Sequence, residues 1–144
     1  VQKCPLQTQL FPHTFEILNY LKNKYNLHII TNGFEEVQNI KLETSNLLPF
    51  FQNIITSERV NVKKPDPKIF QYALDLSAVK AENAIMIGDD LPVDILGAKN
   101  NDIFAIQVKT GKYQIGDESD KYEQPDERIN SIKDLPVLMS INWF

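Results

Sequence analysis

Short, continuous apolar runs alternate along the chain with longer segments in which apolar residues recur every three or four positions. The short runs predict strands, and their lack of polar alternation is typical of strands buried on both faces. We expect these strands at residues 27–31, 53–56, 84–87, 103–108 and 128–132. The periodic segments predict helices starting near residue 12 and at 34–45, 67–76, 92–99 and, weakly, 133–140. Because strand and helix alternate, we expect an α/β fold, a Rossmann-like doubly wound parallel sheet with helices on both faces.

Local turn chemistry predicts where several helices begin and end. Asn46 should end its helix in a left-handed conformation, and Asn61 should occupy another left-handed turn within an irregular loop. Asp66 should cap the helix that follows it, with Pro67 in the first helical position, where no N–H is needed. The polar run 110–127 predicts a long surface loop.

Composition narrows the class of protein. The 144 residues suit one domain, and a hydrophobic share of 42% is enough for a core. The formal net charge is -4 and lysine and arginine form no block, which argues against a nucleic-acid-binding surface. No apolar run approaches the ~18 residues of a membrane span, and no signal peptide is recognisable. We therefore expect a cytoplasmic globular domain that binds neither nucleic acid nor membrane.

The residues that follow each strand are the candidates for chemistry, because ligands of parallel sheets bind beyond the carboxyl ends of the strands. Thr31, Asn32 and Gly33 follow the strand at 27–31. The Thr31 hydroxyl and the backbone N–H groups of this turn could bind an oxyanion such as phosphate. The alternative is that Thr31 or Asn32 only caps the next helix.

A lysine follows the strand at 53–56, in the stretch "VKKPDPKIF". The prolines stiffen this loop and push Lys64 toward an extended conformation, so its ammonium could be held as a point charge. The alternative is that Lys63 and Lys64 are both solvated surface charges.

Three carboxylates follow the strand at 84–87, in "GDDLPVD". Three like charges exceed what helix capping needs, and a hard cation such as Mg²⁺ would offset their repulsion. Asp89, directly at the strand end, is the best candidate ligand, and Asp94 could reach a metal-bound water. Asp90 is the best candidate for a capping or solvated role. Capping of the next helix remains the alternative for the group as a whole.

These three strand ends together supply what phosphoryl transfer requires. A doubly wound sheet brings neighbouring strand ends into one crevice. There Mg²⁺ and Lys64 would neutralise a phosphate, while Thr31 and backbone amides would orient it. The pattern therefore predicts a phosphate site.

The stretches "IITNG", "KKPDPKIF" and "MIGDDLPVDILGA" resemble motifs two, three and four of the haloacid dehalogenase-like hydrolase superfamily, in the same order. Members are mostly Mg²⁺-dependent phosphatases, and the chain is most similar to the helical-cap group that includes nucleotidases. The resemblance implies that Thr31 binds phosphate and that Lys64 steadies phosphate and nucleophile. It also implies that Asp89 ligates Mg²⁺ and that Asp94 supports the metal shell.

One family motif is missing. The nucleophile and the acid/base of the family are the aspartates of a D-x-D motif after the first strand, and no D-x-D occurs in this sequence. In the family that strand lies between the strands carrying motifs two and four, and the cap follows it. We therefore interpret residues 1–11 as a remnant of the cap or linker and 12–144 as a partial core domain, lacking the first strand and the cap.

Three arrangements would account for the missing strand. The sequence could be a fragment of a longer enzyme, or another chain or segment could supply the strand. The third arrangement is a closed sheet, in which strands 27–31 and 84–87 become neighbours. An unfilled gap would expose apolar strand edges, which invites pairing with other chains.

The leading hypothesis is a Mg²⁺-dependent phosphatase of small phosphorylated metabolites, acting through an aspartyl-phosphate whose nucleophile is absent from this chain. One alternative is a 2-haloacid dehalogenase, an enzyme that uses no metal. Related dehalogenases carry serine or asparagine where this chain has Asp89, which favours the phosphatase. The other is a non-catalytic domain, which the missing D-x-D supports. A phospho-receiver domain is disfavoured because its acids precede its lysine along the chain, the reverse of the order here.

Overall fold

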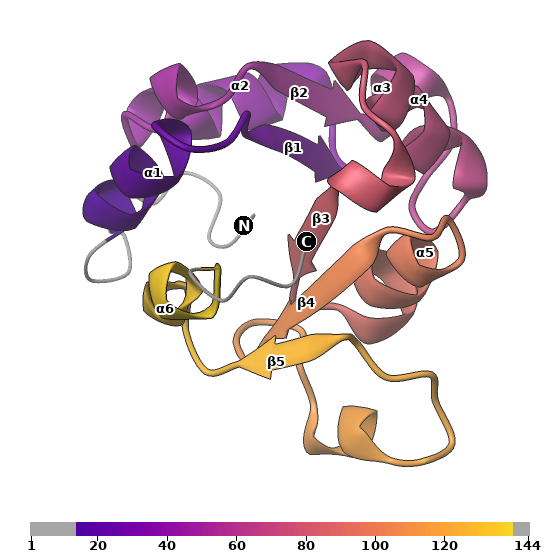
Figure 1. Ribbon diagram of the computed structural model, residues 1–144. Coiled ribbons are helices and arrows are strands. Elements are labelled where there is room, and N and C mark those ends of the chain that lie inside the picture. The colour runs from indigo at the N-terminus through magenta and orange to yellow at the C-terminus, as the bar shows by residue number, and fades with distance from the viewer. Residues whose placement is uncertain (1–13, 140–144) are drawn as a thin grey trace.

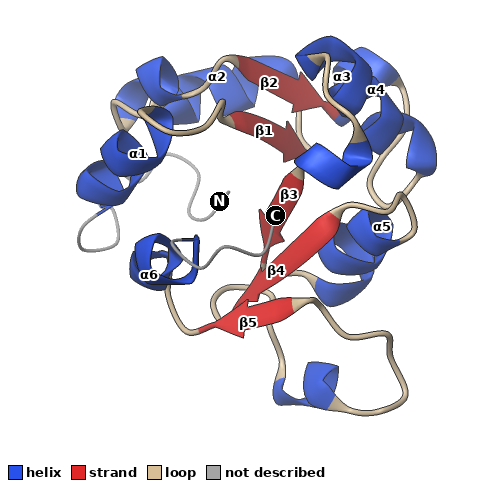
Figure 2. Cartoon of the chain, viewed as in Figure 1, coloured by secondary structure: helices blue, strands red, loops and turns tan. Residues whose placement is uncertain are grey.

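The protein folds as parallel strands covered by helices, and the computed structural model describes residues 14–139. All strand pairs are parallel, but they form two separate groups, β2–β1 and β3–β4–β5. The strands are β1 (His28–Thr31), β2 (Asn53–Thr56), β3 (Ile85–Gly88), β4 (Phe104–Val108) and β5 (Glu127–Ile129). In Figure 1, β1 and β2 lie in the upper part of the view and β3, β4 and β5 lie below them. Figure 2 separates strands from helices by colour. The predicted α/β class is confirmed.

Helices alternate with the strands along most of the chain, as the pattern predicts. They are α1 (Thr14–Lys22), α2 (Glu35–Thr44), α3 (Ser57–Val60), α4 (Pro67–Ser77), α5 (Leu96–Lys99) and α6 (Leu135–Met139). Two differences from the sequence prediction stand out. The loop expected before Pro67 contains the short helix α3, which the Thr56 side chain caps by accepting from the Arg59 N–H. The helix expected at 92–99 begins instead as a π-helical turn, Leu91–Ile95.

The core lies on both faces of the strands, which explains their continuous apolar runs. On one face, α4 and α5 bury a cluster with β2 and β4 that includes Ile55, Phe70 and Ala105. On the other face, α1 and α6 pack against β4 and β5. None of the helices within residues 14–139 is long and apolar enough to cross a membrane. The assignment of residues 1–11 to a cap or linker lies outside the described residues.

β1 and β3 do not pair, so the predicted arrangement in which the sheet closes is wrong. Helix α1 packs on both strand groups at once. Its Leu18 joins a cluster with Ile29 of β1, while its Ile17 joins the cluster that contains Ile106 of β4. A cavity of about 1250 Å³ therefore remains, lined by residues of both β1 and β3.

Left-handed residues end several elements, two of them as predicted. Asn46 has φ 59° and Asn61 has φ 67°. Ala78, which ends α4, adopts φ 56°, a conformation that alanine enters at a cost because of its Cβ. Its N–H satisfies the Asp75 and Leu74 carbonyls, so the turn is a real helix terminator.

Replacing Ala78 by glycine should stabilise the protein. Glycine enters the left-handed region freely, so we expect Ala78→Gly to raise the free energy of unfolding by about 0.5–1 kcal/mol. Urea unfolding followed by circular dichroism measures the change. Ala73→Gly, within the same helix, is the matched control and should destabilise. A loss of stability in Ala78→Gly would contradict the strain assigned to this turn.

Candidate functional site

The end of β1 is tied to the loop that follows β2. The Asn32 side chain accepts a hydrogen bond from the Lys64 N–H at 2.7 Å and donates one to the Lys64 carbonyl at 3.1 Å. Helix α2 is capped by Phe34 without a side-chain hydrogen bond, so the alternative that Thr31 or Asn32 caps it is wrong. Asn32 instead fixes the backbone that carries Lys64.

Lys64 is held by a buried ion pair and is not a solvated surface charge. Its Nζ donates to Asp94 Oδ1 at 2.6 Å, and both side chains are only 9% exposed. Lys63 is exposed, so the alternative of a solvated surface charge is correct for Lys63 and wrong for Lys64. The Asp66 side chain accepts from the Lys68 N–H and caps α4, as predicted. The loop is therefore held at Lys64 by the Asn32 contacts and two residues later by the Asp66 cap.

Asp94 reaches Lys64 because β3 ends in glycine. A Cβ added at Gly88 would lie 2.5 Å from Asp94 Oδ2 and 2.6 Å from its Cβ, so no larger residue fits there. The π-helical turn brings the buried Asp94 carboxylate back toward the strand end, where Oδ2 also accepts from the Asp90 N–H at 3.3 Å. The positive partner of this carboxylate is therefore Lys64.

Asp89 is oriented by two groups that the sequence analysis did not single out. Its Oδ2 accepts from the Lys112 N–H at 3.0 Å, and its backbone carbonyl accepts from Gln107 Nε2 at 3.1 Å. Gln107 could have been noticed, because it is a lone amide within the apolar run at 103–108. Lys112 carried no such signal, because the contact uses its backbone.

Asp90 carries the strongest sign of crowded negative charge. Partial burial raises the pKa of its carboxyl, the charges of Asp94 and Asp89 raise it further, and a hydrogen bond from the Val93 N–H opposes them. Asp90 stands at the N-cap position of the following turn, where its carboxyl faces the Val93 N–H, so the predicted capping role stays a prediction. A solvated role for Asp90 stays a prediction.

The predicted site residues meet at one cavity. The cavity between the strand groups is lined by Thr31, Asn32, Lys64, Asp89 and Asp94. Gly33 is not among the described residues that line it, and it packs instead against the Gln38 side chain. The structure thus brings together the hydroxyl, the lysine and the carboxylates, but not Gly33.

The donors fit part of a Mg²⁺ shell. Residues 14–139 contain no group of three or more acidic, histidine or cysteine side chains able to hold a metal together. Mg²⁺ commonly takes one or two carboxylates and completes its shell with water and phosphate oxygens. Asp89 fits one such position, while Asp94 is engaged by Lys64. Further ligands would have to come from substrate, water and groups outside this chain.

A family model described as haloacid dehalogenase-like hydrolase matches residues 2–108. The glyceraldehyde 3-phosphate phosphatase of Methanocaldococcus jannaschii is 36% identical over 126 residues, covering 87% of this chain and 54% of that protein. The same enzyme of Pyrococcus furiosus is 38% identical, covering 87% and 50%. A pyrimidine 5'-nucleotidase of Escherichia coli is 38% identical over 90 residues, covering 62% and 40%. The chain spans about half the length of these relatives.

Solved structures show the same likeness. A HAD phosphatase from Thermococcus onnurineus superposes with a TM-score of 0.79 at 32% identity, covering 91% of this chain and 58% of that one. A HAD-hydrolase from Bacillus subtilis bound to magnesium has a TM-score of 0.84 at 27% identity, covering 93% and 57%.

Removing the Lys64 charge should destabilise the fold strongly. Lys64→Met would leave the buried Asp94 carboxylate without its cation, at an expected cost of about 3 kcal/mol or more in unfolding free energy. Chemical denaturation measures this cost. Lys63→Met removes the neighbouring exposed charge and should stay within about 0.5 kcal/mol of the wild type. Equal losses in the two variants would show that the ion pair contributes nothing.

Stability should depend on pH through Asp90. A raised pKa in the folded state means that its stabilising contribution is complete at acid pH and is lost as the pH rises through the raised pKa. Asp90→Asn should therefore be more stable than the wild type at neutral pH and equal to it below the ordinary aspartate pKa. Melting temperatures across this range test the prediction, with the exposed-loop variant Asp120→Asn controlling for loss of one charge. A difference between Asp90→Asn and wild type that stays constant with pH would contradict it.

Proposed function

The chain belongs to the haloacid dehalogenase-like hydrolase family, and we propose that it forms part of a Mg²⁺-dependent phosphatase of small phosphorylated metabolites. The observation that carries the proposal is the cavity at which Thr31, Lys64 and Asp89 meet. Relatives named glyceraldehyde 3-phosphate phosphatase and pyrimidine 5'-nucleotidase support the class of substrate. The net charge of -4 supports a small-molecule partner rather than nucleic acid. We also propose that the protein binds no membrane and is cytoplasmic.

Each of the three residues has a distinct part in binding a phosphomonoester. The Lys64 ammonium would neutralise phosphate charge while staying anchored by Asp94, so it needs little reordering when substrate enters. The buried Thr31 hydroxyl would donate to a phosphate oxygen and orient it. Asp89 would hold Mg²⁺, and the Asp94 carboxylate, besides anchoring Lys64, would support the metal shell through a metal-bound water. When bound, the metal would supply charge neutralisation of the phosphoryl group.

The nucleophile must come from outside this sequence, because no D-x-D occurs in it. An aspartate oxygen would attack phosphorus while the bond to the alcohol oxygen breaks, and a second carboxyl would protonate the leaving alcohol. Water would then hydrolyse the acyl phosphate, releasing phosphate and restoring the carboxylate. We propose that another segment or chain supplies this residue on an apolar strand between β1 and β3, where the cavity lies.

The other candidates have weaker support. A 2-haloacid dehalogenase from Pseudomonas syringae superposes with a TM-score of 0.77 at 30% identity, so a dehalogenase remains the alternative enzyme. Asp89 favours the phosphatase because a hard carboxylate oxygen suits Mg²⁺. Thr31, Lys64, Asp89 and Asp94 together line one cavity, and a non-catalytic domain would have no use for this combination of phosphate-binding and metal-binding groups.

Complementation tests the proposal directly. The chain alone should not hydrolyse p-nitrophenyl phosphate with Mg²⁺. Co-expression with the part of the Pyrococcus furiosus relative that it does not match should restore turnover, because that part would fill the gap between β1 and β3. A panel including glyceraldehyde 3-phosphate, a pyrimidine 5'-nucleotide and a 2-haloacid would then identify the substrate class.

Matched variants make the assay specific to the site. In the complemented protein, Asp89→Asn should lower turnover at least 100-fold, in the range that follows loss of a charge-stabilising group. Asp75→Asn, on the exposed face of α4, should leave turnover unchanged. Turnover by the chain alone would refute the absence of the nucleophile, and 2-haloacid hydrolysis without metal would favour the dehalogenase.

A further inference from the structure

A buried amide lies in the middle of an apolar strand beside the site. Gln107 of β4 is 0% exposed and stands between the buried residues Ile106 and Val108. Its Nε2 donates to the Asp89 carbonyl at 3.1 Å and to Asp117 Oδ2 at 3.0 Å, and its Oε1 accepts from Arg128 Nε at 2.9 Å. Burying an amide is unfavourable unless its polar atoms are bonded, and these contacts meet that requirement.

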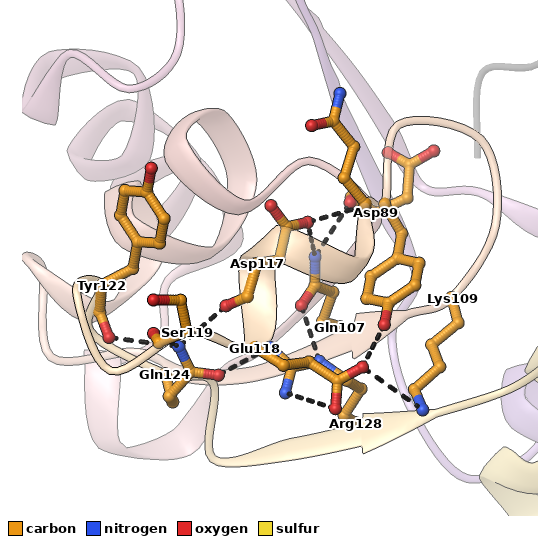
Figure 3. A network of polar contacts seen from close by, with 11 residues as sticks. Asp89, Gln107, Lys109, Asp117, Glu118, Ser119, Tyr122, Gln124 and Arg128 are labelled. Carbon is orange, nitrogen blue, oxygen red and sulfur yellow. Dashed lines mark hydrogen bonds and ion pairs between the residues drawn. The ribbon is translucent and has the colours of Figure 1, made fainter.

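Asp117 links this amide to the long loop after β4, as Figure 3 shows. The same Asp117 oxygen accepts from the Gln114 N–H at 3.0 Å and so closes the short turn at Ile115–Glu118. Arg128 Nη2 donates to Gln124 Oε1, and Gln124 Nε2 donates to the Asp117 carbonyl at 2.8 Å. The loop is therefore fastened to Gln107 by a connected set of hydrogen bonds.

Glu118 fastens the outer side of the same loop. The Tyr113 hydroxyl donates to its carboxylate, and Lys109 lies 3.7 Å away as an ion-pair partner (Figure 3). The hydrogen bond from Tyr113 and the nearby positive charges lower the pKa of Glu118. The polar run predicted as a surface loop is thus held by Asp117 on its inner side and by Glu118 on its outer side.

This loop returns to the site at Lys112. Gly111, in the left-handed region at φ 52°, turns the backbone so that the Lys112 N–H donates to Asp89 Oδ2 at 3.0 Å. Gln107 holds the carbonyl of Asp89, and the loop that Gln107 anchors holds its carboxylate. Gln107 therefore bonds the backbone of Asp89 directly and is connected to its side chain through the loop.

We propose that Gln107 is a positioning residue that sets the orientation of Asp89 toward a divalent cation and couples the 109–124 loop to that cation. The proposal rests on the proposed function of Asp89 as a metal ligand. Groups that hold a ligand from behind commonly change metal affinity by about 10–100-fold when removed. An apolar side chain in the same place would fill the core equally well but would hold neither Asp89 nor the loop.

Two variants break the link at different points, and a third serves as control. Gln107→Leu removes the amide while keeping much of its volume, and Asp117→Ala cuts the connection to the loop without altering the buried strand. Asp126→Asn is the matched control: Asp126 accepts from the Ala105 N–H at 2.8 Å and pairs with Lys99. The Asp126→Asn substitution therefore weakens β4 at its other end, away from Asp89.

Amide NMR on the ¹⁵N-labelled chain provides the two readouts. Mg²⁺ titration, followed at the Lys112 amide, should show a half-saturating concentration raised about tenfold in Gln107→Leu and Asp117→Ala. Hydrogen exchange of the same amide without metal should speed up about tenfold in both variants. Asp126→Asn should change neither readout, even if its melting temperature falls as far as those of Gln107→Leu and Asp117→Ala.

The outcomes separate this inference from the proposed function. If both Lys112 readouts stay at wild-type values in Gln107→Leu and Asp117→Ala, the positioning role is overturned. If Asp126→Asn shifts them equally, the effect is general destabilisation and the role is also overturned. If Mg²⁺ does not perturb the wild-type chain, this chain does not hold the cation by itself and the metal part of the inference is overturned. The proposed function is then judged by the complementation assay, while exchange at Lys112 still decides whether Gln107 controls the loop.

Discussion

The buried ion pair between Lys64 and Asp94 is the interaction on which the rest of the site depends. It joins the loop after β2 to the turn after β3, and Asn32 joins the end of β1 to the backbone of the same lysine. Since β1 and β3 share no backbone hydrogen bonds, these polar contacts link the two strand groups at their carboxyl ends. The glycine at the end of β3 is a condition of the pair, because any side chain there would displace the Asp94 carboxylate.

The distribution of charge follows from this arrangement. Lys64 neutralises Asp94, and a backbone N–H orients Asp89. Partial burial, together with the charges of Asp94 and Asp89, raises the pKa of the Asp90 carboxyl. The site therefore keeps more negative than positive charge at the end of β3, which favours a cation there. Gln107 and its loop hold Asp89, while Lys64 holds Asp94, so these two aspartates are fixed by different parts of the chain.

The space between β1 and β3 separates the two strand groups. Helix α1 packs on both groups, and a cavity bordered by apolar strands and by the polar site lies between them. Unpaired strand edges readily accept another strand. In the proposed function, this chain would bind phosphate and metal, and whatever fills the gap would supply the nucleophile.

The sequence by itself determined the strands, the parallel α/β class and the caps at Asn46, Asn61 and Asp66, because periodicity and turn chemistry act over a few residues. It also placed Thr31, Lys64 and Asp89 at strand ends, since order along the chain sets which residue follows each strand. Only the tertiary structure decided that Lys64 is buried against Asp94, that the Asn32 side chain hydrogen-bonds the Lys64 backbone and that Gln107 donates to the Asp89 carbonyl. It also decided that β1 and β3 stay apart. These contacts join residues distant in sequence, so they depend on how packed helices space the strands, which no local pattern specifies.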